Sequence, residues 1–325
     1  MRPIPDFFEP PPSHVVNDYY NLVVALNNTI PEKTSNNLLI ATWNLKKFSS
    51  LTKKWLSDSN DSPKRDFTAI QTITEIVSRF DVVAIQEVMG NLRALRYLIN
   101  MLGKDWAFLM TDITLGVAGG AERMAFVFNR TRVKLSGLAC ELVIPPDWSE
   151  NITNQYPQQF ARTPYAVSFK RESATFILVT LHIDYGDQSI DRIPELKDIA
   201  KWMYDWAERV TSWHHNLITL GDFNIDREGD ELWGAFTSTG LKVPKCLENQ
   251  KRSIFATAED TKKEKYYDQI AWFQDSAKNN LIEMKINDGD NFDFLPYVYQ
   301  HLSLKKNSIQ HRISDHYPLW CEFII

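Results

Sequence analysis

The stretch Leu38-Leu39-Ile40-Ala41-Thr42-Trp43-Asn44 is a nearly continuous apolar run that ends in an amide. A second run of this kind, Asp81-Val-Val-Ala-Ile-Gln-Glu87, ends in an amide and a carboxylate. A strand that is apolar at successive positions buries both of its faces, which is typical of sheets covered on both sides. The two stretches therefore predict large, mostly buried sheets with helices packed against them.

The rest of the chain alternates helical and strand patterns in its first half and carries consecutive strands in its middle. Ser62 and Pro63 have the residue types of a helix N-cap and a first-turn proline, and they predict a helix that presents apolar residues as far as Phe80. The periodicity predicts further helices over residues 13–26, 92–102 and 193–210. Strands are expected over residues 124–129, 166–170, 176–183, 217–220, 269–273 and 318–325. The simplest organisation is one domain over residues 38–325, preceded by a proline-rich arm and short helix over residues 1–37.

The composition is that of a soluble globular protein. Among 325 residues, 36 Lys and Arg stand against 41 Asp and Glu, and this acidic balance argues against broad electrostatic capture of nucleic acid. Three widely spaced cysteines give no disulfide framework. No apolar run approaches the roughly 20 residues of a membrane span, and the first residues lack the apolar region of a signal peptide. We expect a monomer, cytoplasmic by default, and infer no protein partner.

Polar residues stand at or near the ends of the predicted strands, where a core strand would not have them. Each one alone has an ordinary explanation, since a strand-end Asp is usually a turn or cap residue and a His is usually a satisfied core or surface residue. Several together suggest a site, because ligands and reactive groups gather where strand ends converge. The residues are Asn44, Gln86, Glu87, His182, Asp222, Asn224, Asp268, Asp315 and His316.

Oxygen donors dominate this set and favour a hard metal ion, Mg²⁺ first and Mn²⁺ or Ca²⁺ as alternatives. The two histidines could instead suggest zinc, but each can pair with an acid, as a general acid or base does. In Gly221-Asp222-Phe223-Asn224, the glycine is expected to let the chain turn sharply as it leaves its strand. The oxygen donors are Asn44, Glu87, Asp222, Asn224 and Asp315.

A set of short motifs, taken in this order, resembles the endonuclease/exonuclease/phosphatase superfamily, and most closely its pancreatic deoxyribonuclease I branch. The resemblance covers residues 38–325. It implies a four-layer α/β sandwich, with two central mixed β-sheets flanked by helices and a site at one edge. The motifs are Ala41-Thr-Trp-Asn44, Ile85-Gln-Glu87, Glu122-Arg123, Leu181-His182, Gly221-Asp222-Phe-Asn224, Tyr267-Asp268 and Ser314-Asp315-His316.

The resemblance also implies a metal site and a phosphate contact. Glu87 matches the principal Mg²⁺ ligand, and Asn44 and Asp315 match residues that complete or support the site. Arg162 matches an arginine that contacts the substrate phosphate, and Asn44 is expected to contact that phosphate as well.

The remaining roles implied by the resemblance concern proton transfer. His182 matches the histidine that protonates the leaving oxygen, and Glu122 the acid that orients it. His316, paired with Asp268, matches a second histidine that activates water or holds the phosphate. The acid and the amide of Asp222–Asn224 match groups that position water and stabilise the transition state.

Two positions depart from the pancreatic enzymes, whose arginine and tyrosine reach into the DNA minor groove. The chain has Met89 and Gly120 there, which puts a preference for duplex DNA in doubt. The expected activity is divalent-metal-dependent hydrolysis of phosphodiester bonds in DNA or RNA. An alternative is a phosphoesterase on a small or lipid substrate, of the sphingomyelinase or inositol-phosphate phosphatase type. A non-catalytic binding module with a retired site is a third possibility.

Overall fold

Two six-stranded mixed sheets face each other in the computed structural model, which describes residues 1–114, 120–143, 160–208, 216–256, 265–274 and 280–325. The first sheet has the spatial order β11 (Lys285–Asn291), β12 (Leu319–Ile324), β1 (Asn37–Phe48), β2 (Val82–Met89), β4 (Glu122–Asn129) and β3 (Trp106–Met110). The second has the order β5 (Lys134–Glu141), β6 (Tyr165–Arg171), β7 (Ala174–His182), β8 (Leu217–Ile225), β10 (Tyr266–Phe273) and β9 (Leu241–Lys242). In each sheet, one central pair is parallel, β1 with β2 and β7 with β8.

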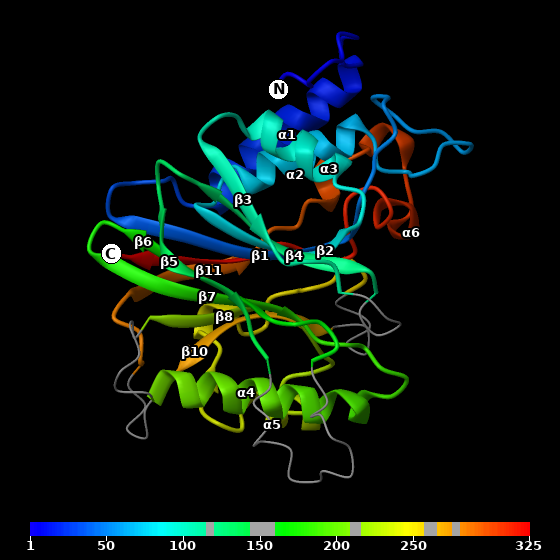
Figure 1. Ribbon diagram of the computed structural model, residues 1–325. Helices are drawn as coiled ribbons and strands as arrows, with labels where there is room; N and C mark the ends of the chain where they lie inside the picture. The colour runs from blue at the N-terminus through cyan, green and yellow to red at the C-terminus, as the bar shows by residue number, and fades with distance from the viewer. Residues whose placement is uncertain (115–119, 144–159, 209–215, 257–264, 275–279) are drawn as a thin grey trace.

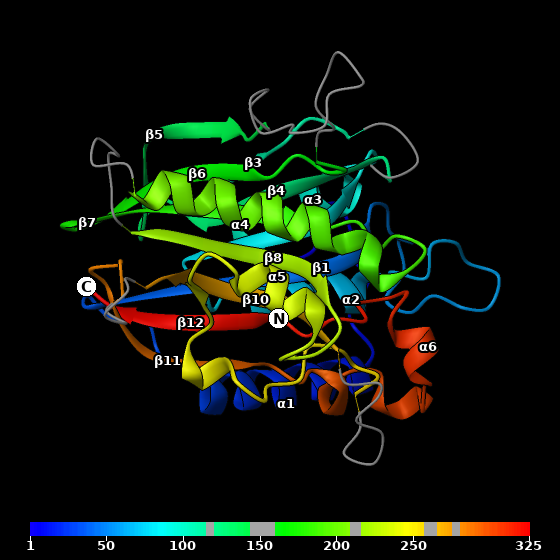
Figure 2. The ribbon, with the colours of Figure 1, turned by 90° about the horizontal axis from the view of Figure 1, so that it is seen from below.

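Helices cover the outer face of each sheet, so the molecule has four layers (Figure 1). The first sheet carries α1 (Ser13–Thr29), α2 (Phe67–Val77) and α3 (Arg93–Leu102). Figure 2 shows α4 (Ile193–Glu208) and α5 (Glu231–Thr237) lying across the second sheet. The one other α-helix that the structure describes is the short α6 (Lys306–Ile309). The predicted four-layer α/β sandwich is confirmed. Within the described ranges, no helix is long and apolar enough to cross a bilayer.

The central strands are buried on both faces, which is why their sequences are apolar without alternation. In β1, Leu38 and Ile40 belong to the core between the two sheets. Leu39, Ala41 and Trp43 belong to the core beneath the helices of the first sheet. Successive side chains of a strand point to opposite faces, so one continuous apolar run serves two cores.

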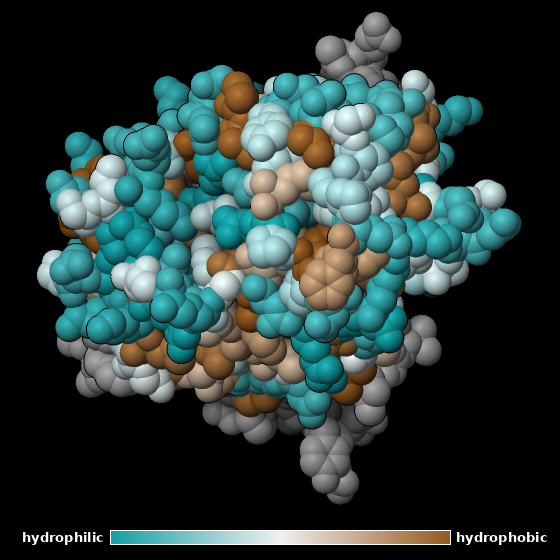
Figure 3. Space-filling view, turned by 90° about the horizontal axis from the view of Figure 1, so that it is seen from above, coloured by the Kyte–Doolittle hydropathy of each residue, from teal (hydrophilic) through white to brown (hydrophobic). Residues whose placement is uncertain are grey.

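The N-terminal segment lies against the helical layer of the first sheet. Helix α1 confirms the helix expected over residues 13–26 and runs three residues further. The Tyr19 hydroxyl donates to Oε2 of Glu75 on α2 at 2.8 Å, and Leu22 and Leu26 are buried. Figure 3 shows that the outer surface on this side is mainly hydrophilic, with scattered hydrophobic residues. The boundary drawn at residue 37 stays a prediction.

The predicted start of the second helix at Ser62 and Pro63 is wrong. Helix α2 begins at Phe67, and Asp66 is its N-cap. The Asp66 carboxylate accepts a hydrogen bond from the Ala69 backbone N–H at 3.0 Å, which satisfies one of the unpaired amides of the first turn. An aspartate is as good a cap as a serine, and Asp66 is the residue whose side chain reaches the first turn of this helix. The helix predicted over residues 193–210 is α4, which the structure describes as far as Glu208. Residues 209–210 of that prediction lie outside the described residues.

The predicted turn at Gly221 is also wrong, because β8 continues through it to Ile225. Gly221 has a φ of +146°, and a Cβ placed on it would lie 2.1 Å from the Leu181 carbonyl oxygen on β7. The glycine is therefore needed for the close approach of two parallel strands, not for an exit from the sheet.

We predict that Gly221→Ala lowers the free energy of unfolding by about 3 kcal/mol or more, because a methyl group would force β7 away from β8. Urea denaturation followed by circular dichroism measures the loss. Gly234→Ala in α5 is the matched control: nothing lies within 4 Å of its Cβ position, and alanine should stabilise that helix by up to about 1 kcal/mol. Equal stabilities for the two variants would contradict this account of Gly221.

Candidate active site

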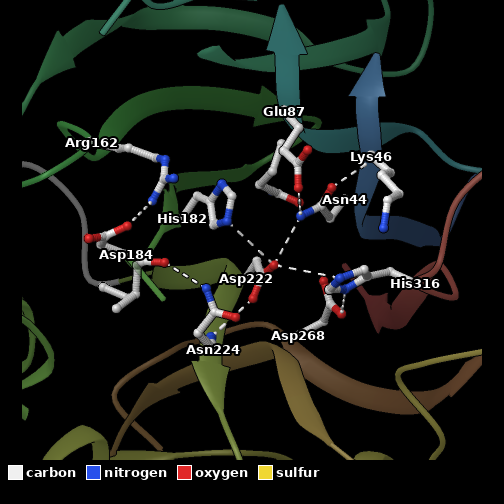
Figure 4. Close-up of polar contacts among 12 residues, drawn as sticks. Asn44, Lys46, Glu87, Arg162, His182, Asp184, Asp222, Asn224, Asp268 and His316 are labelled. Carbon is white, nitrogen blue, oxygen red and sulfur yellow. Dashed lines mark hydrogen bonds and ion pairs between the residues drawn. The ribbon is translucent and has the colours of Figure 1, made fainter. Parts of the chain in front are cut away.

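Strand register brings the polar residues of the second sheet to one edge. His182 at the end of β7 pairs in register with Asp222 on β8, and Asp222 pairs with Asp268 on β10. In the first sheet, Asn44 on β1 pairs with Gln86 on β2, one residue before Glu87. Because both sheets are stacked with these edges together, the two sets face each other (Figure 4).

The Asp222 carboxylate lies at the centre of the cluster (Figure 4). It is 2% exposed, and its Oδ2 accepts a hydrogen bond from Nδ2 of Asn44 at 2.9 Å. The Nε2 atoms of His182 and His316 lie 3.6 and 3.8 Å from the same oxygen. Its Oδ1 accepts from the Asn224 backbone N–H at 3.0 Å. Burial alone would raise the pKa of Asp222, but the two imidazoles and the donated hydrogen bonds hold it below its usual value.

His182 is held from behind by Glu122, the first residue of β4. Its Nδ1 lies 3.0 Å from Oε2 of Glu122, so Nε2 is the nitrogen that faces Asp222. Burial lowers the pKa of His182, but the hydrogen bond and charge of Glu122, with the charge of Asp222, raise it above the ordinary value. The arrangement fixes the ring orientation and favours the protonated imidazole.

His316 is held by Asp268 in the same manner. Its Nδ1 lies 2.6 Å from Oδ2 of Asp268, and the neighbouring acids raise the pKa of His316 well above its ordinary value in spite of burial. Burial raises the pKa of Asp268 to about 6, because His316 offsets only part of the desolvation. The pairing thus favours the charged forms of both groups, the imidazolium and the carboxylate. The Ser314 hydroxyl accepts from the His316 backbone N–H at 3.0 Å and fixes the loop.

The predicted metal ligands lie on the first-sheet side of the cluster. Asn44 Nδ2 donates to Oε1 of Glu87 at 2.9 Å, and the Lys47 backbone N–H donates to Oε2 at 2.8 Å. Asp315 instead forms an ion pair of 2.6 Å with Nζ of Lys46. The described residues contain no group of three or more His, Cys, Asp or Glu suited to a metal. The ligand set therefore stays a prediction.

Arg162 is engaged by two carboxylates. Its Nε donates to Oε1 of Glu122, and its Nη1 lies 3.4 Å from Oδ1 of Asp184. The side chain still lines the pocket, so its predicted phosphate contact is compatible with its position but stays a prediction.

These side chains surround an open pocket of about 370 Å³. It is lined by nearly all of the predicted site residues, while Asn44 and Asp268 support the lining side chains from behind. The lining residues are Lys47, Glu87, Met89, Gly120, Glu122, Arg162, His182, Tyr185, Asp222, Asn224, Tyr267, Asp315 and His316.

Four residues of the site had no role in the sequence analysis. Lys46 pairs with Asp315, but strand alternation could not have placed it, because β1 is irregular between Asn44 and Phe48 and Lys46 has a positive φ. Lys47, Tyr185 and Tyr267 line the pocket. Tyr267 stands next to Asp268 in one of the quoted motifs, which could have pointed to it, whereas no motif contains Lys47 or Tyr185.

A fully buried arginine, Arg65, ties together the two chain segments that flank the first-sheet half of the site. It donates to the carbonyl oxygens of Leu45, Lys46 and Lys47, which follow Asn44. It also donates to the carbonyl oxygens of residues 312 and 313, shortly before Asp315. The guanidinium thus fixes the backbone of both segments.

Comparison with known proteins shows which sequences and structures this chain resembles. The model of the endonuclease/exonuclease/phosphatase family matches residues 41–280. A deoxyribonuclease of Thioalkalivibrio sp. (strain K90mix) is 28% identical over 62% of this chain, and the match spans half of that protein's length. Deoxyribonuclease-1 of Bos taurus is 25% identical over 78% of this chain and 84% of its own length.

Among solved structures, the human Nocturnin catalytic domain with bound sulfate anion superimposes with a TM-score of 0.58 at 13% identity. The superposition covers 90% of this chain and 95% of that domain. At this identity the likeness concerns the fold alone. With the family match over most of its length, the chain belongs to the endonuclease/exonuclease/phosphatase family.

We predict that Glu122→Gln lowers the pKa of His182, because the variant removes the charge that offsets burial of the imidazole. NMR titration of the histidine Cε1–H resonances measures this directly and does not depend on any activity. Glu283→Gln, an exposed change, is the control and should leave every histidine pKa unchanged. An unaltered His182 titration in Glu122→Gln would show that Glu122 does not set its charge.

Proposed function

We propose that the protein is a divalent-metal-dependent phosphodiesterase that hydrolyses nucleic acid. One observation carries the proposal: two imidazoles, each held by a buried carboxylate, present their Nε2 atoms to one pocket on either side of Asp222. In-line hydrolysis of a phosphodiester needs a proton for the leaving oxygen, a held water and stabilisation of negative charge. The cluster offers a group for each of these.

In the proposed reaction, His182 donates the proton on Nε2 to the leaving oxygen. Glu122 keeps Nδ1 occupied, so the donating nitrogen can only be Nε2. His316 binds a phosphate oxygen or the attacking water through its own Nε2, with Asp268 behind it. Asp222 lies between the two rings and orients them and the water.

The oxygen donors of the first sheet fit a hard divalent ion. Glu87 would hold it, with Asn44 and Asp315 in support, and most of the coordination would come from water and substrate, as is usual for Mg²⁺. Glu87 accepts one hydrogen bond on each oxygen, which leaves acceptor capacity toward the pocket that it lines. When bound, the ion supplies positive charge that polarises the phosphoryl group.

Likeness to two deoxyribonucleases favours nucleic acid over a small or lipid phosphoester. We expect the purified protein to cleave plasmid, single-stranded DNA or RNA with Mg²⁺ and to lose this cleavage with a chelator. His182→Ala and His316→Ala should each lower the rate about 10²–10⁴-fold, the usual range for a general acid or base.

His311→Ala is the matched control for these variants, since His311 is exposed and absent from the pocket. Cleavage that survives His182→Ala unchanged would point to a contaminating nuclease or to a site without catalysis. Release of phosphate or phosphocholine from small or lipid phosphoesters, with no cleavage of nucleic acid, would establish the alternative substrate class.

We also predict that Glu87→Gln weakens Mn²⁺ binding at least about tenfold, the smallest loss common for groups that only support a ligand. Isothermal titration calorimetry in the absence of substrate gives the affinity. Glu283→Gln should bind Mn²⁺ as the wild type does. Unchanged affinity in Glu87→Gln would exclude this carboxylate as the principal ligand.

A further inference from the structure

Tyr185 presents an exposed aromatic ring at the wall of the pocket. It follows His182 by three residues, lines the pocket and is 50% exposed. An aromatic ring that is half exposed to solvent beside a reactive centre offers apolar surface that a bound ligand can cover. Neither the proposed proton transfers nor the metal site uses this side chain.

The ring is held in place by Arg192. The guanidinium carbon lies 4.0 Å from the ring centroid, so one face of Tyr185 rests on a cation. Arg192 is itself buried and anchored, because its Nε donates to the Tyr185 carbonyl at 2.7 Å and its Nη1 to the Asn224 carbonyl at 2.6 Å. The anchored arginine fixes the ring before any ligand arrives, which lowers the entropy cost of binding.

A second ring links Tyr185 to the centre of the site. Tyr267 meets Tyr185 edge to face, with the ring centroids 6.5 Å apart, and lies 5.6 Å from the His316 ring. Tyr185 and Tyr267 are the tyrosines among the described residues that line the pocket. Their rings are therefore in contact with each other, and through Tyr267 with the His316 imidazole.

We propose that Tyr185 is a stacking platform for the nucleobase next to the phosphodiester that is cleaved, and that it makes the enzyme prefer single-stranded over duplex nucleic acid. The inference rests on the proposed function and names the substrate class of the same site. In a duplex both faces of a base are covered by its neighbours, whereas a single strand can offer a base face to a protein ring. Stacking on a ring is tolerant of base identity, so the preference concerns strandedness rather than sequence.

A binding cycle tests the contact without cleavage. In the His182→Ala background with Mg²⁺, the affinity of a fluorescent oligothymidylate is compared with that of strands in which one base is replaced by an abasic analogue. The abasic analogue is placed at each position in turn. At the position whose base stacks on Tyr185, it should weaken binding roughly tenfold to a hundredfold when Tyr185 is present, and hardly at all in Tyr185→Ala. Tyr185→Trp should restore the dependence. Equal losses with and without the ring, or no binding of the strand, overturn the inference.

A kinetic test uses the active protein. Tyr185→Ala should raise KM for a single-stranded oligonucleotide roughly tenfold to a hundredfold and leave kcat little changed, because stacking stabilises the bound substrate and the transition state equally. Its kcat/KM for duplex of the same sequence should stay that of the wild type. Tyr20→Ala is the matched control, an exposed tyrosine on α1 that also meets a second tyrosine edge to face.

The two proposals can fail separately. A wild-type protein that cleaves no nucleic acid overturns the proposed function, and the binding cycle still decides whether Tyr185 stacks on a base. A wild-type protein that cleaves both substrates, with single-strand and duplex rates equally affected or equally unaffected by Tyr185→Ala, overturns the inference and leaves the nuclease activity standing.

Discussion

Burial of one negative charge governs the architecture of this edge of the molecule. The Asp222 carboxylate lies almost out of contact with solvent, and such a charge is tolerated only when cations and hydrogen-bond donors surround it. Those partners come from both sheets and a loop: Asn44 from the first sheet, His182 from the second and His316 from the loop before β12. The edges of the two sheets must therefore meet within hydrogen-bonding distance, and the core between the sheets has to allow it.

Each sheet supplies its part through one parallel pair of strands. Parallel neighbours end at the same edge, so β7 and β8 present His182 and Asp222 side by side, and β1 and β2 do the same for Asn44 and Glu87. The antiparallel neighbours then deliver the residues that hold the rings, Glu122 on β4 among them. His182 is fixed by the strand that carries it, and His316, on the loop before β12, is fixed by Asp268 and Ser314, which suits groups that must keep one nitrogen aimed at the pocket.

The sequence was most informative where burial was complete. Central strands such as β1 and β2 are continuously apolar, and the polar residues at their ends identified most of the cluster. Edge strands escaped prediction: β11, with the sequence Lys285-Ile-Asn-Asp-Gly-Asp-Asn291, is held by backbone pairing to β12 and carries little apolar pattern. Gly221 was misread because its role depends on a strand that lies 40 residues away. Tyr185 was missed because its role depends on the position of its ring, which is set by packing against Arg192 and cannot be inferred from the sequence.

Arg65 holds two chain segments beside the site through their main-chain carbonyl oxygens. Its guanidinium grips main-chain carbonyls of residues 45–47 and 312–313, and burial lowers its pKa to about 10 without removing its charge at neutral pH. Main-chain carbonyls are the same whatever side chain a residue bears. Arg65 therefore holds these two segments through their backbone, and its hydrogen bonds do not depend on which side chains the segments bear. Other constraints act on those side chains, because Leu45 and Ile313 are buried in the core and Lys46 and Lys47 have a positive φ. A lysine at position 65, with one nitrogen in place of a planar fork, could not reach all five carbonyl oxygens.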